Sequence, residues 1–242
     1  MDLKKEKNML EKIAGEYIDT DPGRIIDRKI LAMVVGQIMP WIKGPDVLEM
    51  GFGDDAWTTS VIKKFGKSSI VDASEILLNQ AKNKYGKKIT TFNNLFEDFK
   101  PAVKFDSVIA SFILEHVDNP VNIMKKARAW IKPGGQMIVI VPNANSYHRR
   151  VAVKMNLHKK ISDIGSTDKQ MGHRRVYTVS SMEKDITAAG LKVKKKNGFF
   201  LKFLPQGMMT GFSDDLLLGF MKLGEEAPME ECATIAFNCG IN

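Results

Sequence analysis

Long apolar runs are absent from this 242-residue sequence. No run reaches the ~18 residues that suggest a membrane-spanning helix. The N-terminal stretch MDLKKEKNMLEKIAGEY is charged throughout and lacks the apolar core of a signal peptide. We therefore expect no membrane span and a cytoplasmic protein. Cysteine is also scarce: Cys232 and Cys239 are the only two, and their spacing matches no metal-site pattern. We predict that both are reduced, structural thiols, and we predict no metal site.

The sequence has no repeat of domain scale and no low-complexity tract. Its hydrophobic (44%) and charged (26%) fractions are those of an ordinary globular protein, and its length suits one domain. Positive charge is unevenly placed. Residues 121–202 hold 18 Lys and Arg against 4 Asp and Glu, a local balance of +14 in a chain of net charge +8. This basic part indicates an acidic ligand, a nucleic acid or an anionic surface, or else a solvated rim.

Short apolar runs alternate with amphipathic stretches along most of the chain. The runs are rich in Val, Ile and Phe and are bounded by Gly, Pro, Asp or Asn, which predicts strands. They lie at 45–52, 68–74, 89–94, 105–112 and 135–142. The stretches between them predict helices, so we expect an α/β fold with a Rossmann-like, doubly wound, mostly parallel sheet. An amphipathic helix at 211–224 and an antiparallel C-terminal strand at 232–240 are expected to close one sheet edge.

Two segments interrupt this alternation. N-terminal helices precede the first strand, and a polar, basic insertion with helical and loop character follows the fifth strand, where it can cover the ligand-binding edge of the sheet. The helix after the insertion is predicted to begin at Ser180, with Glu183 completing a capping box. We therefore divide a single domain, 1–242, into a helical lid at 1–40, a cofactor-binding core at 45–142, a substrate-side insertion at 143–178 and C-terminal helices and strands at 179–242.

A glycine-containing turn follows the first predicted strand in VLEMGFGDDAW. Gly51 and Gly53 allow the tight turn and close backbone approach that a nucleotide ligand needs, and with Ala56 they satisfy G-x-G-x-x-G/A. Asp72 ends the next strand, 21 residues after Gly51, where a carboxylate can accept hydrogen bonds from ribose hydroxyls. This spacing alone permits a nicotinamide cofactor or another adenosine-bearing cofactor.

Four motifs in order resemble the class I S-adenosylmethionine-dependent methyltransferases, in particular their small-molecule group. VLEMGFGDD is similar to the first motif, VDASEILLNQAK to the second-strand motif, FDSVIASFILEHVDNP to the fourth-strand motif and ARAWIKPGGQMIVIVPN to the approach to the fifth strand. The match runs from about Val47 to Pro142, with a looser similarity in GHRRVYT. A nicotinamide site would leave Glu49 and the Lys-Pro-Gly-Gly turn unexplained. The resemblance therefore implies S-adenosylmethionine as cofactor and S-adenosylhomocysteine as product.

The resemblance also implies roles for individual residues along the cofactor. These are Glu49, Gly51 and Gly53 at the methionine end, Asp72 at the ribose diol, Ala73, Asn94 and Leu95 around the adenine, and Ser111 and Phe112 from the fourth strand. One position departs from the family pattern, since Asp55 stands where a third glycine is common. Its side chain either crowds the amino-acid end of the cofactor or bonds to the ammonium group there.

Methyl transfer from a sulfonium is an in-line displacement, so the protein mainly aligns and desolvates the reactants. A general base is needed only when the acceptor is protonated at the working pH. His116, just past the fourth strand, is our candidate base; the alternative is a histidine held by a backbone carbonyl. By resemblance to methyltransferases with helical lids, Tyr17 is a second catalytic candidate, or else a half-buried aromatic.

Two His-Arg-Arg clusters flank the insertion. Arginine's planar fork suits phosphate and carboxylate groups, which predicts an acidic acceptor; the alternative is a solvated, salt-bridged rim. The predicted substrate-binding residues are His148, Arg149, His173, Arg174 and Arg175.

The leading functional hypothesis is therefore O-methylation of a small acidic metabolite by a monomer or homodimer. The metabolite would be a phosphate, phosphonate, carboxylate or sugar derivative. RNA methylation is an alternative, weakened because no appended RNA-binding motif is visible and aromatic residues are sparse among the basic ones. A non-catalytic S-adenosylmethionine-binding domain is a third hypothesis, supported only by Asp55.

Overall fold

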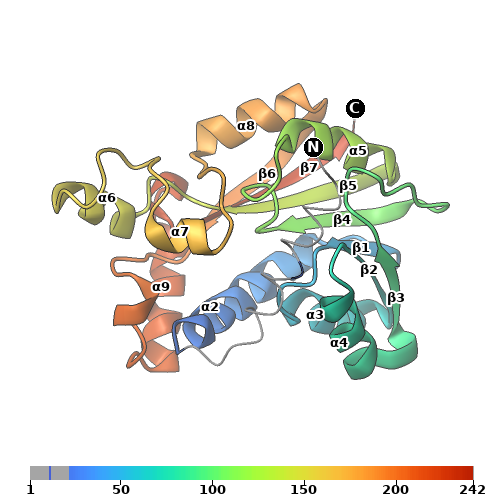
Figure 1. Cartoon of the computed structure of the whole chain (residues 1–242), viewed down its shortest axis with the longest axis horizontal. Coiled ribbons are helices and arrows are strands. Elements are labelled where there is room, and N and C mark those ends of the chain that lie inside the picture. The colour runs from blue at the N-terminus through green and yellow to red at the C-terminus, as the bar shows by residue number, and fades with distance from the viewer. Residues whose placement is uncertain (1–10, 12–21, 242) are drawn as a thin grey trace.

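The computed structural model describes residue 11 and residues 22–241 of the chain. In this part of the chain the strands form one seven-stranded sheet (Figure 1). The strands are β1 (Val47–Met50), β2 (Ser68–Asp72), β3 (Ile89–Asn93), β4 (Phe105–Ser111), β5 (Ile131–Pro142), β6 (Leu191–Phe199) and β7 (Thr234–Ile241). Their order across the sheet is β3-β2-β1-β4-β5-β7-β6. Neighbours from β3 to β5 pair in parallel, whereas β7 is antiparallel to both β5 and β6.

Helices cover both faces of the sheet, so the described chain has three layers. The helices are α2 (Pro22–Ile38), α3 (Ala56–Phe65), α4 (Glu75–Tyr85), α5 (Pro120–Ala129), α6 (Tyr147–Lys154), α7 (Ser166–Gln170), α8 (Val179–Ala188) and α9 (Asp214–Glu226). In Figure 1, α5 and α8 lie on one face, and α2, α3, α4 and α9 lie on the other. None of the helices among the described residues is long and apolar enough to span a membrane.

The parallel strands are apolar on both faces because each face packs against helices. In β4, Val108 and Ala110 belong to the core under α5 and α8, while Ile109 between them packs toward α2 and α3. All three side chains are fully buried. The thiols of Cys232 and Cys239 are also buried and unpaired, as predicted.

Helix ends follow ordinary capping chemistry, with one correction to the sequence prediction. In α8 the N-cap is Thr178, two residues before the predicted Ser180. The Thr178 hydroxyl accepts from the Ser181 N–H at 3.2 Å, and the Ser181 hydroxyl accepts from the Thr178 N–H at 2.9 Å, which closes the capping box. Glu183 instead accepts from the Lys196 ammonium at 2.7 Å. Tyr177, the residue before this N-cap, forms an isolated bridge with Asn143, so the extended segment ends directly before the helix.

The predicted fold class is confirmed: a mostly parallel, Rossmann-like sheet with an antiparallel last strand. The insertion after β5 is present as α6, α7 and their loops. These lie beyond the carboxyl ends of β4 and β5 (Figure 1). Ligands of open α/β sheets bind at this edge, so the fold brings the predicted site residues toward one place.

Candidate active site

The turn after β1 is fastened to the end of β2. The Asp72 carboxylate accepts from the Phe52 N–H at 2.7 Å with Oδ2 and from the Ser74 N–H at 2.7 Å with Oδ1. The Gly51 N–H donates to the Val71 carbonyl at 2.8 Å. Asp72 therefore links the glycine turn to the start of α4, and each of its oxygens keeps a lone pair for a ligand.

Gly51 has the backbone conformation that favours glycine. Its φ is +78°, and a Cβ built there would lie 2.6 Å from Cδ1 of Ile113 and 3.9 Å from Oδ2 of Asp72. The missing side chain keeps the turn open beside the Asp72 carboxylate. Ile113 lies where a side chain at this position would need to be, and the close approach of a ligand to the turn stays a prediction.

Three carboxyl groups, those of Glu49, Asp54 and Asp72, lie close to this turn. Burial raises the pKa of Glu49 to about 8 even though the Thr58 hydroxyl donates to it at 2.5 Å, and the neighbouring Asp54 and Asp72 carboxylates raise it further. Burial also raises the pKa values of Asp54 and Asp72. Such a cluster favours a ligand that carries positive charge, because a cation would stabilise the ionised carboxylates.

A hollow of about 310 Å³ lies beside the turn. It is lined by Arg28 of α2, the turn residues Phe52, Gly53, Asp54 and Asp55, and Leu77, Gln80 and Lys84 of α4. Asp55 forms an ion pair with Lys84, so its carboxylate is already neutralised by a cation of α4. Its effect on the amino-acid end of the cofactor stays a prediction.

The remaining predicted cofactor residues lie at the carboxyl ends of β2, β3 and β4. The Asn94 N–H donates to the Asp72 carbonyl at 3.1 Å, and the carbonyl of Ala73 accepts from the Asn93 side chain at 3.0 Å. Leu95 follows Asn94 directly. These contacts hold the segments after β2 and β3 together along one side of the site.

Ser111 and Phe112 leave β4 on the other side. Phe112 has a φ of 54°, uncommon for a residue with a side chain, and its N–H donates to the Ile140 carbonyl at 2.8 Å. The Ser111 hydroxyl is buried and has no hydrogen-bond partner among the described residues. A cationic, adenosine-bearing cofactor therefore fits the arrangement: carboxylates and an open glycine turn at one end, and an unsatisfied hydroxyl near the middle.

His116 lies in the turn after β4. Burial is the main reason that its pKa is lowered to about 4, and the nearby His173 lowers it further, so its imidazole is neutral at pH 7. Its ring hydrogen-bonds the Gly172 backbone, which agrees with the alternative that a backbone group holds this histidine. One ring nitrogen keeps a lone pair, so a role in proton transfer stays a prediction. Tyr17, the second catalytic candidate, lies outside the described residues.

The second His-Arg-Arg cluster is fastened to the turn after β4. Arg175 donates to the carbonyls of Leu114 (2.9 Å), Val117 and Asp118 (3.0 Å). The Arg174 N–H donates to the Glu115 carbonyl at 2.8 Å, and its guanidinium pairs with Asp118. The guanidinium of Arg175 thus serves to hold backbone, and Arg174, with its side chain 33% exposed, is the more accessible of the two.

The first cluster holds the insertion together in a similar way. Arg149 is buried and donates to the Asp168 carboxylate at 3.1 Å and to the carbonyls of Ile161 (3.0 Å) and Asp163 (2.5 Å). His148 is bonded to the Ser146 hydroxyl at 3.1 Å, and burial lowers its pKa to about 3. These contacts favour a structural role over substrate binding. Each of the three guanidinium nitrogens of Arg149 donates to a protein oxygen.

Three candidate functional residues were not predicted from the sequence. Glu115 is fully buried next to His116; burial raises its pKa to about 7, and no other described residue donates a hydrogen bond to either of its oxygens. Asp168 accepts from His173 Nδ1 at 3.1 Å. Lys202, three residues after β6 at the ligand edge, is only 8% exposed, and burial lowers its pKa. The Leu-Glu-His-Val motif is the one sequence signal that could have indicated Glu115.

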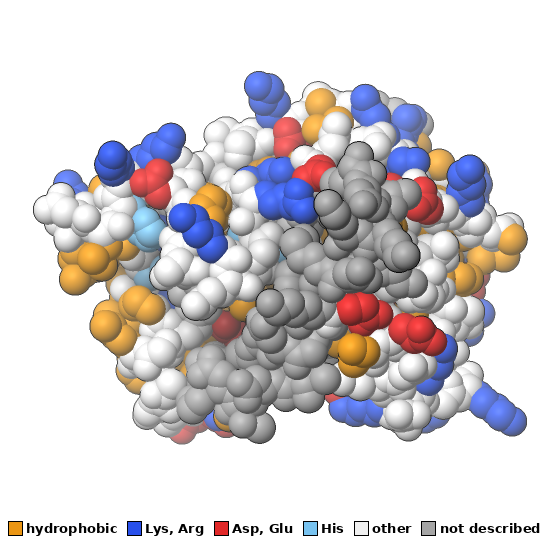
Figure 2. Space-filling model, in the orientation of Figure 1, with side chains coloured by type: hydrophobic (Ala, Val, Ile, Leu, Met, Phe, Trp, Pro, Cys, Tyr) orange, Lys and Arg blue, Asp and Glu red, His pale blue; other side chains and the backbone are white. Residues whose placement is uncertain are grey.

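The basic side chains do not form a continuous tract on the face shown in Figure 2. There, Lys and Arg side chains are scattered around the edge and interspersed with Asp and Glu. On this face the positive charge therefore does not gather in one patch.

Comparisons with known proteins show the family of this chain. A family model described as a methyltransferase domain matches residues 24–196. The chain is 32% identical over 108 residues to a ubiquinone biosynthesis O-methyltransferase of Coxiella burnetii; the match covers 43% of this chain and 46% of that protein. The chain thus matches less than half the length of this curated relative.

Solved structures share the fold over nearly the whole chain. The N-methyltransferase NodS of Bradyrhizobium japonicum, in complex with S-adenosylhomocysteine, has a TM-score of 0.59 and 13% identity, covering 94% of this chain and 96% of its own. A possible histamine N-methyltransferase of Thermotoga maritima has a TM-score of 0.60 and 17% identity, covering 89% and 91%.

Proposed function

We propose that this chain, which belongs to the class I S-adenosylmethionine-dependent methyltransferases and uses S-adenosylmethionine as its cofactor, methylates an oxygen atom of a small acidic metabolite. When bound, the cofactor supplies an activated methyl group that an oxygen nucleophile can take directly. The chain's own contribution is to hold the two reactants in line and to exclude water.

The carboxylates at the ends of β1 and β2 would hold the cofactor. Asp72 would accept the ribose hydroxyls with its remaining lone pairs, while Glu49 and Asp54 would face the positively charged methionine end. Gly51 and Gly53 would allow the backbone to approach that end closely. Ala73, Asn94, Leu95, Ser111 and Phe112 would contact the rest of the molecule.

The buried ammonium of Lys202 carries the proposal of an acidic acceptor. It follows β6, whose carboxyl end lies at the same edge as those of β1 to β5, and it is 8% exposed. Asp27 and Asp168 favour its charge, yet burial still lowers its pKa, so a further anion from the acceptor would stabilise the ammonium. Arg174 and His173 face the same edge from the insertion. A carboxylate or phosphate group of the acceptor would be held by Lys202 and Arg174, with His148, Arg149 and Arg175 maintaining the backbone around it.

Oxygen is favoured as the methylated atom because the site contains a neutral imidazole that could take the proton of a hydroxyl group. A hydroxyl must lose a proton before or during transfer, and the neutral imidazole of His116, just past β4, would assist. The Coxiella burnetii relative is named as an O-methyltransferase, which supports the same choice. RNA as the acceptor is less supported, since basic side chains are interspersed with acidic ones on the face in Figure 2.

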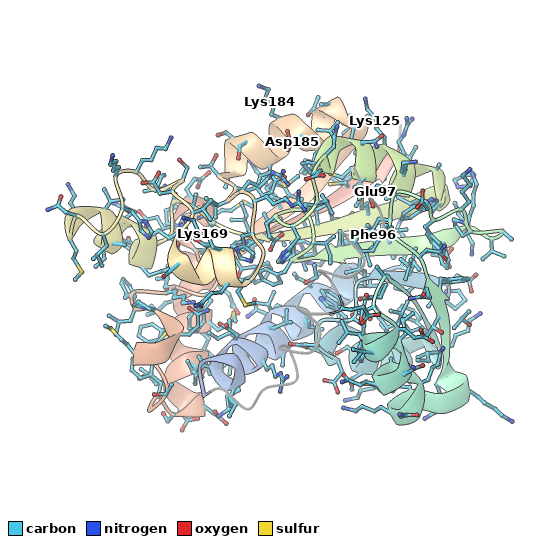
Figure 3. All side chains as sticks on the ribbon, viewed as in Figure 1. Phe96, Glu97, Lys125, Lys169, Lys184 and Asp185 are labelled. Carbon is cyan, nitrogen blue, oxygen red and sulfur yellow. The ribbon has the colours of Figure 1, made fainter. Side chains whose placement is uncertain are left out.

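A coupled S-adenosylhomocysteine assay tests this proposal with matched pairs of acceptors. Each pair would hold a hydroxy acid or sugar phosphate and its neutral amide or dephosphorylated form. We expect turnover with acidic members and little with neutral ones. Lys202→Met should raise KM for the acidic acceptor at least tenfold. Lys184→Met is the matched control, because Lys184 is exposed on α8 and points away from the sheet (Figure 3). Equal turnover of both members would contradict an acidic acceptor.

A further inference from the structure

Three metal-ligating side chains converge at the ligand edge of the sheet. Glu115 and His116 come from the turn after β4, and His173 comes from the segment after α7. One potential ligand atom from each residue lies within 4.8 Å of the other two. The two imidazole rings meet edge to face with their centroids 4.7 Å apart. Small side-chain rotations would bring all three ligand atoms onto one ion.

The Glu115 carboxyl is the least explained group in this cluster. Its side chain is fully buried, and no other described residue donates a hydrogen bond to either oxygen. The nearby guanidinium of Arg175 is committed to the carbonyls of Leu114, Val117 and Asp118. A buried carboxyl without partners costs free energy, and a bound cation is one of the few things that would offset that cost.

Both histidines are oriented as metal ligands usually are. His173 Nδ1 bonds the Asp168 carboxylate at 3.1 Å, and His116 bonds the Gly172 backbone. In metal sites the second ring nitrogen commonly donates to a carboxylate or a backbone carbonyl, which fixes the tautomer and ring position. The Asp168 carboxylate in turn pairs with the Arg149 guanidinium at 3.1 Å, so the group that orients His173 is itself held in place.

We propose that Glu115, His116 and His173 bind one divalent transition-metal cation. Two imidazoles and one carboxylate are a ligand set that suits Zn²⁺, Mn²⁺ or Fe²⁺ better than Mg²⁺, which prefers oxygen ligands. Three protein ligands leave at least one coordination position open, as in catalytic rather than purely structural sites. The site follows the carboxyl end of β4, the edge at which ligands of open α/β sheets bind, so an acceptor at this edge could take the open position.

The metal site specifies the acceptor more closely, and this part rests on the proposed oxygen methylation. The cation would bind a hydroxyl that has a second oxygen donor next to it, such as a carboxylate, a carbonyl or another hydroxyl. Coordination lowers the pKa of that hydroxyl, and its proton leaves to water. The O–CH₃ bond then forms while the S–CH₃ bond breaks, and the sulfur keeps the electron pair. His116 would thus act on the acceptor through the cation.

Metal binding is measured first, independently of activity. The full chain, treated with chelator and desalted, would be titrated with Zn²⁺ by calorimetry, and its metal content would be measured after a second desalting. Co²⁺ provides a visible-absorption signature of histidine ligation. We expect one tight equivalent of Zn²⁺ and weaker binding of Mg²⁺. No binding, or several equivalents of similar affinity, would overturn the site.

Variants identify the ligands. Glu115→Gln and His173→Asn should each lower Zn²⁺ affinity by more than about tenfold, since even second-layer changes have effects of that size. His158→Asn is the matched control, because this fourth histidine lies outside the cluster. Calorimetry with S-adenosylhomocysteine checks that each variant is folded, since the cofactor residues lie elsewhere. Loss of the Zn²⁺ site in His158→Asn but not in Glu115→Gln would assign the metal to another place.

The two proposals fail in distinguishable ways. If Zn²⁺ binds to these residues but no hydroxylated acceptor is methylated, the metal site is confirmed and the proposed reaction is wrong. If acceptors are methylated at oxygen, and neither chelator nor Glu115→Gln changes kcat or KM, the proposed reaction is supported and the proposed role of the metal in it is wrong.

Discussion

The carboxylate of Asp72 accepts a hydrogen bond from the backbone N–H of Phe52 at 2.7 Å, which joins the end of β2 to the turn after β1. Because the same carboxylate bonds Ser74 N–H, one side chain positions both the glycine turn and the start of α4. Cofactor binding and the shape of its site therefore depend on the same group.

Replacing Asp72 with Asn should weaken cofactor binding strongly. The amide has one acceptor oxygen in place of two, so a backbone donor or a ribose hydroxyl loses its partner. Losing a hydrogen bond to a charged group costs about 1.5–3 kcal/mol, so we expect roughly a 10- to 150-fold loss of S-adenosylhomocysteine affinity by calorimetry. Asp98→Asn, at an exposed position, is the control. Unchanged affinity in Asp72→Asn would remove this residue from the cofactor site.

Substituting Gly51 separates backbone strain from steric blocking. Gly51→Ala and Gly66→Ala both place a side chain at positive φ, 78° and 84°, and each should cost about 1–2 kcal/mol of stability in urea unfolding. A Cβ at Gly66 meets nothing within 4 Å, whereas one at Gly51 meets Ile113 at 2.6 Å. Only Gly51→Ala should also lower cofactor affinity. Similar affinity in the two variants would show that the turn does not contact the cofactor.

Cofactor affinity should depend on pH in a predictable direction. The pKa of Glu49 is about 8 in the folded chain, and a cation bound nearby would lower it. Below pH 8, binding must therefore release a proton, so affinity rises with pH and levels off above about 8. Calorimetry from about pH 6 to 9 in buffers of different ionisation enthalpy measures both the affinity and the proton release. Glu49→Gln should flatten the profile; a flat profile in the unaltered chain would contradict this account.

Arg149 should matter more for stability than for cofactor binding. Arg149→Ala breaks its contacts with Asp168, Ile161 and Asp163 and leaves the largely buried Asp168 carboxylate with only the His173 ring and the Gly165 N–H, a loss of about 3 kcal/mol. Arg150→Ala is the neighbouring control. Its guanidinium is 46% exposed and 4.0 Å from Glu231, so less than about 1 kcal/mol is expected. Urea unfolding measures both. A small loss in Arg149→Ala with a large rise in acceptor KM would restore the predicted substrate role.

Much of the core was predictable because its strands are short, apolar and separated by clear helices. The predicted strand at 105–112, for instance, is β4 at Phe105–Ser111. β6 could not be recognised in the same way. Four of its nine residues are lysines, because it is an edge strand that pairs only with β7 and leaves much of its surface in solvent.

The site was predictable only where function depends on local sequence. Gly51 and Asp72 belong to motifs, so their places followed from spacing. Arg149 and Arg175 could not be assigned, because their partners are mostly backbone carbonyls, which leave no trace in the residue types. The metal cluster joins Glu115 to His173, which lie in segments that only the folded chain brings together.

The central claim is tested most directly by following the methyl group itself. Incubation with S-adenosylmethionine carrying a CD₃ group and a panel of small acidic hydroxy compounds, followed by mass spectrometry, identifies the atom that receives the label. We predict that CD₃ appears on a hydroxyl oxygen of an acidic acceptor, with one S-adenosylhomocysteine formed per product. Transfer to nitrogen, transfer to RNA, or transfer only to neutral acceptors would contradict the account.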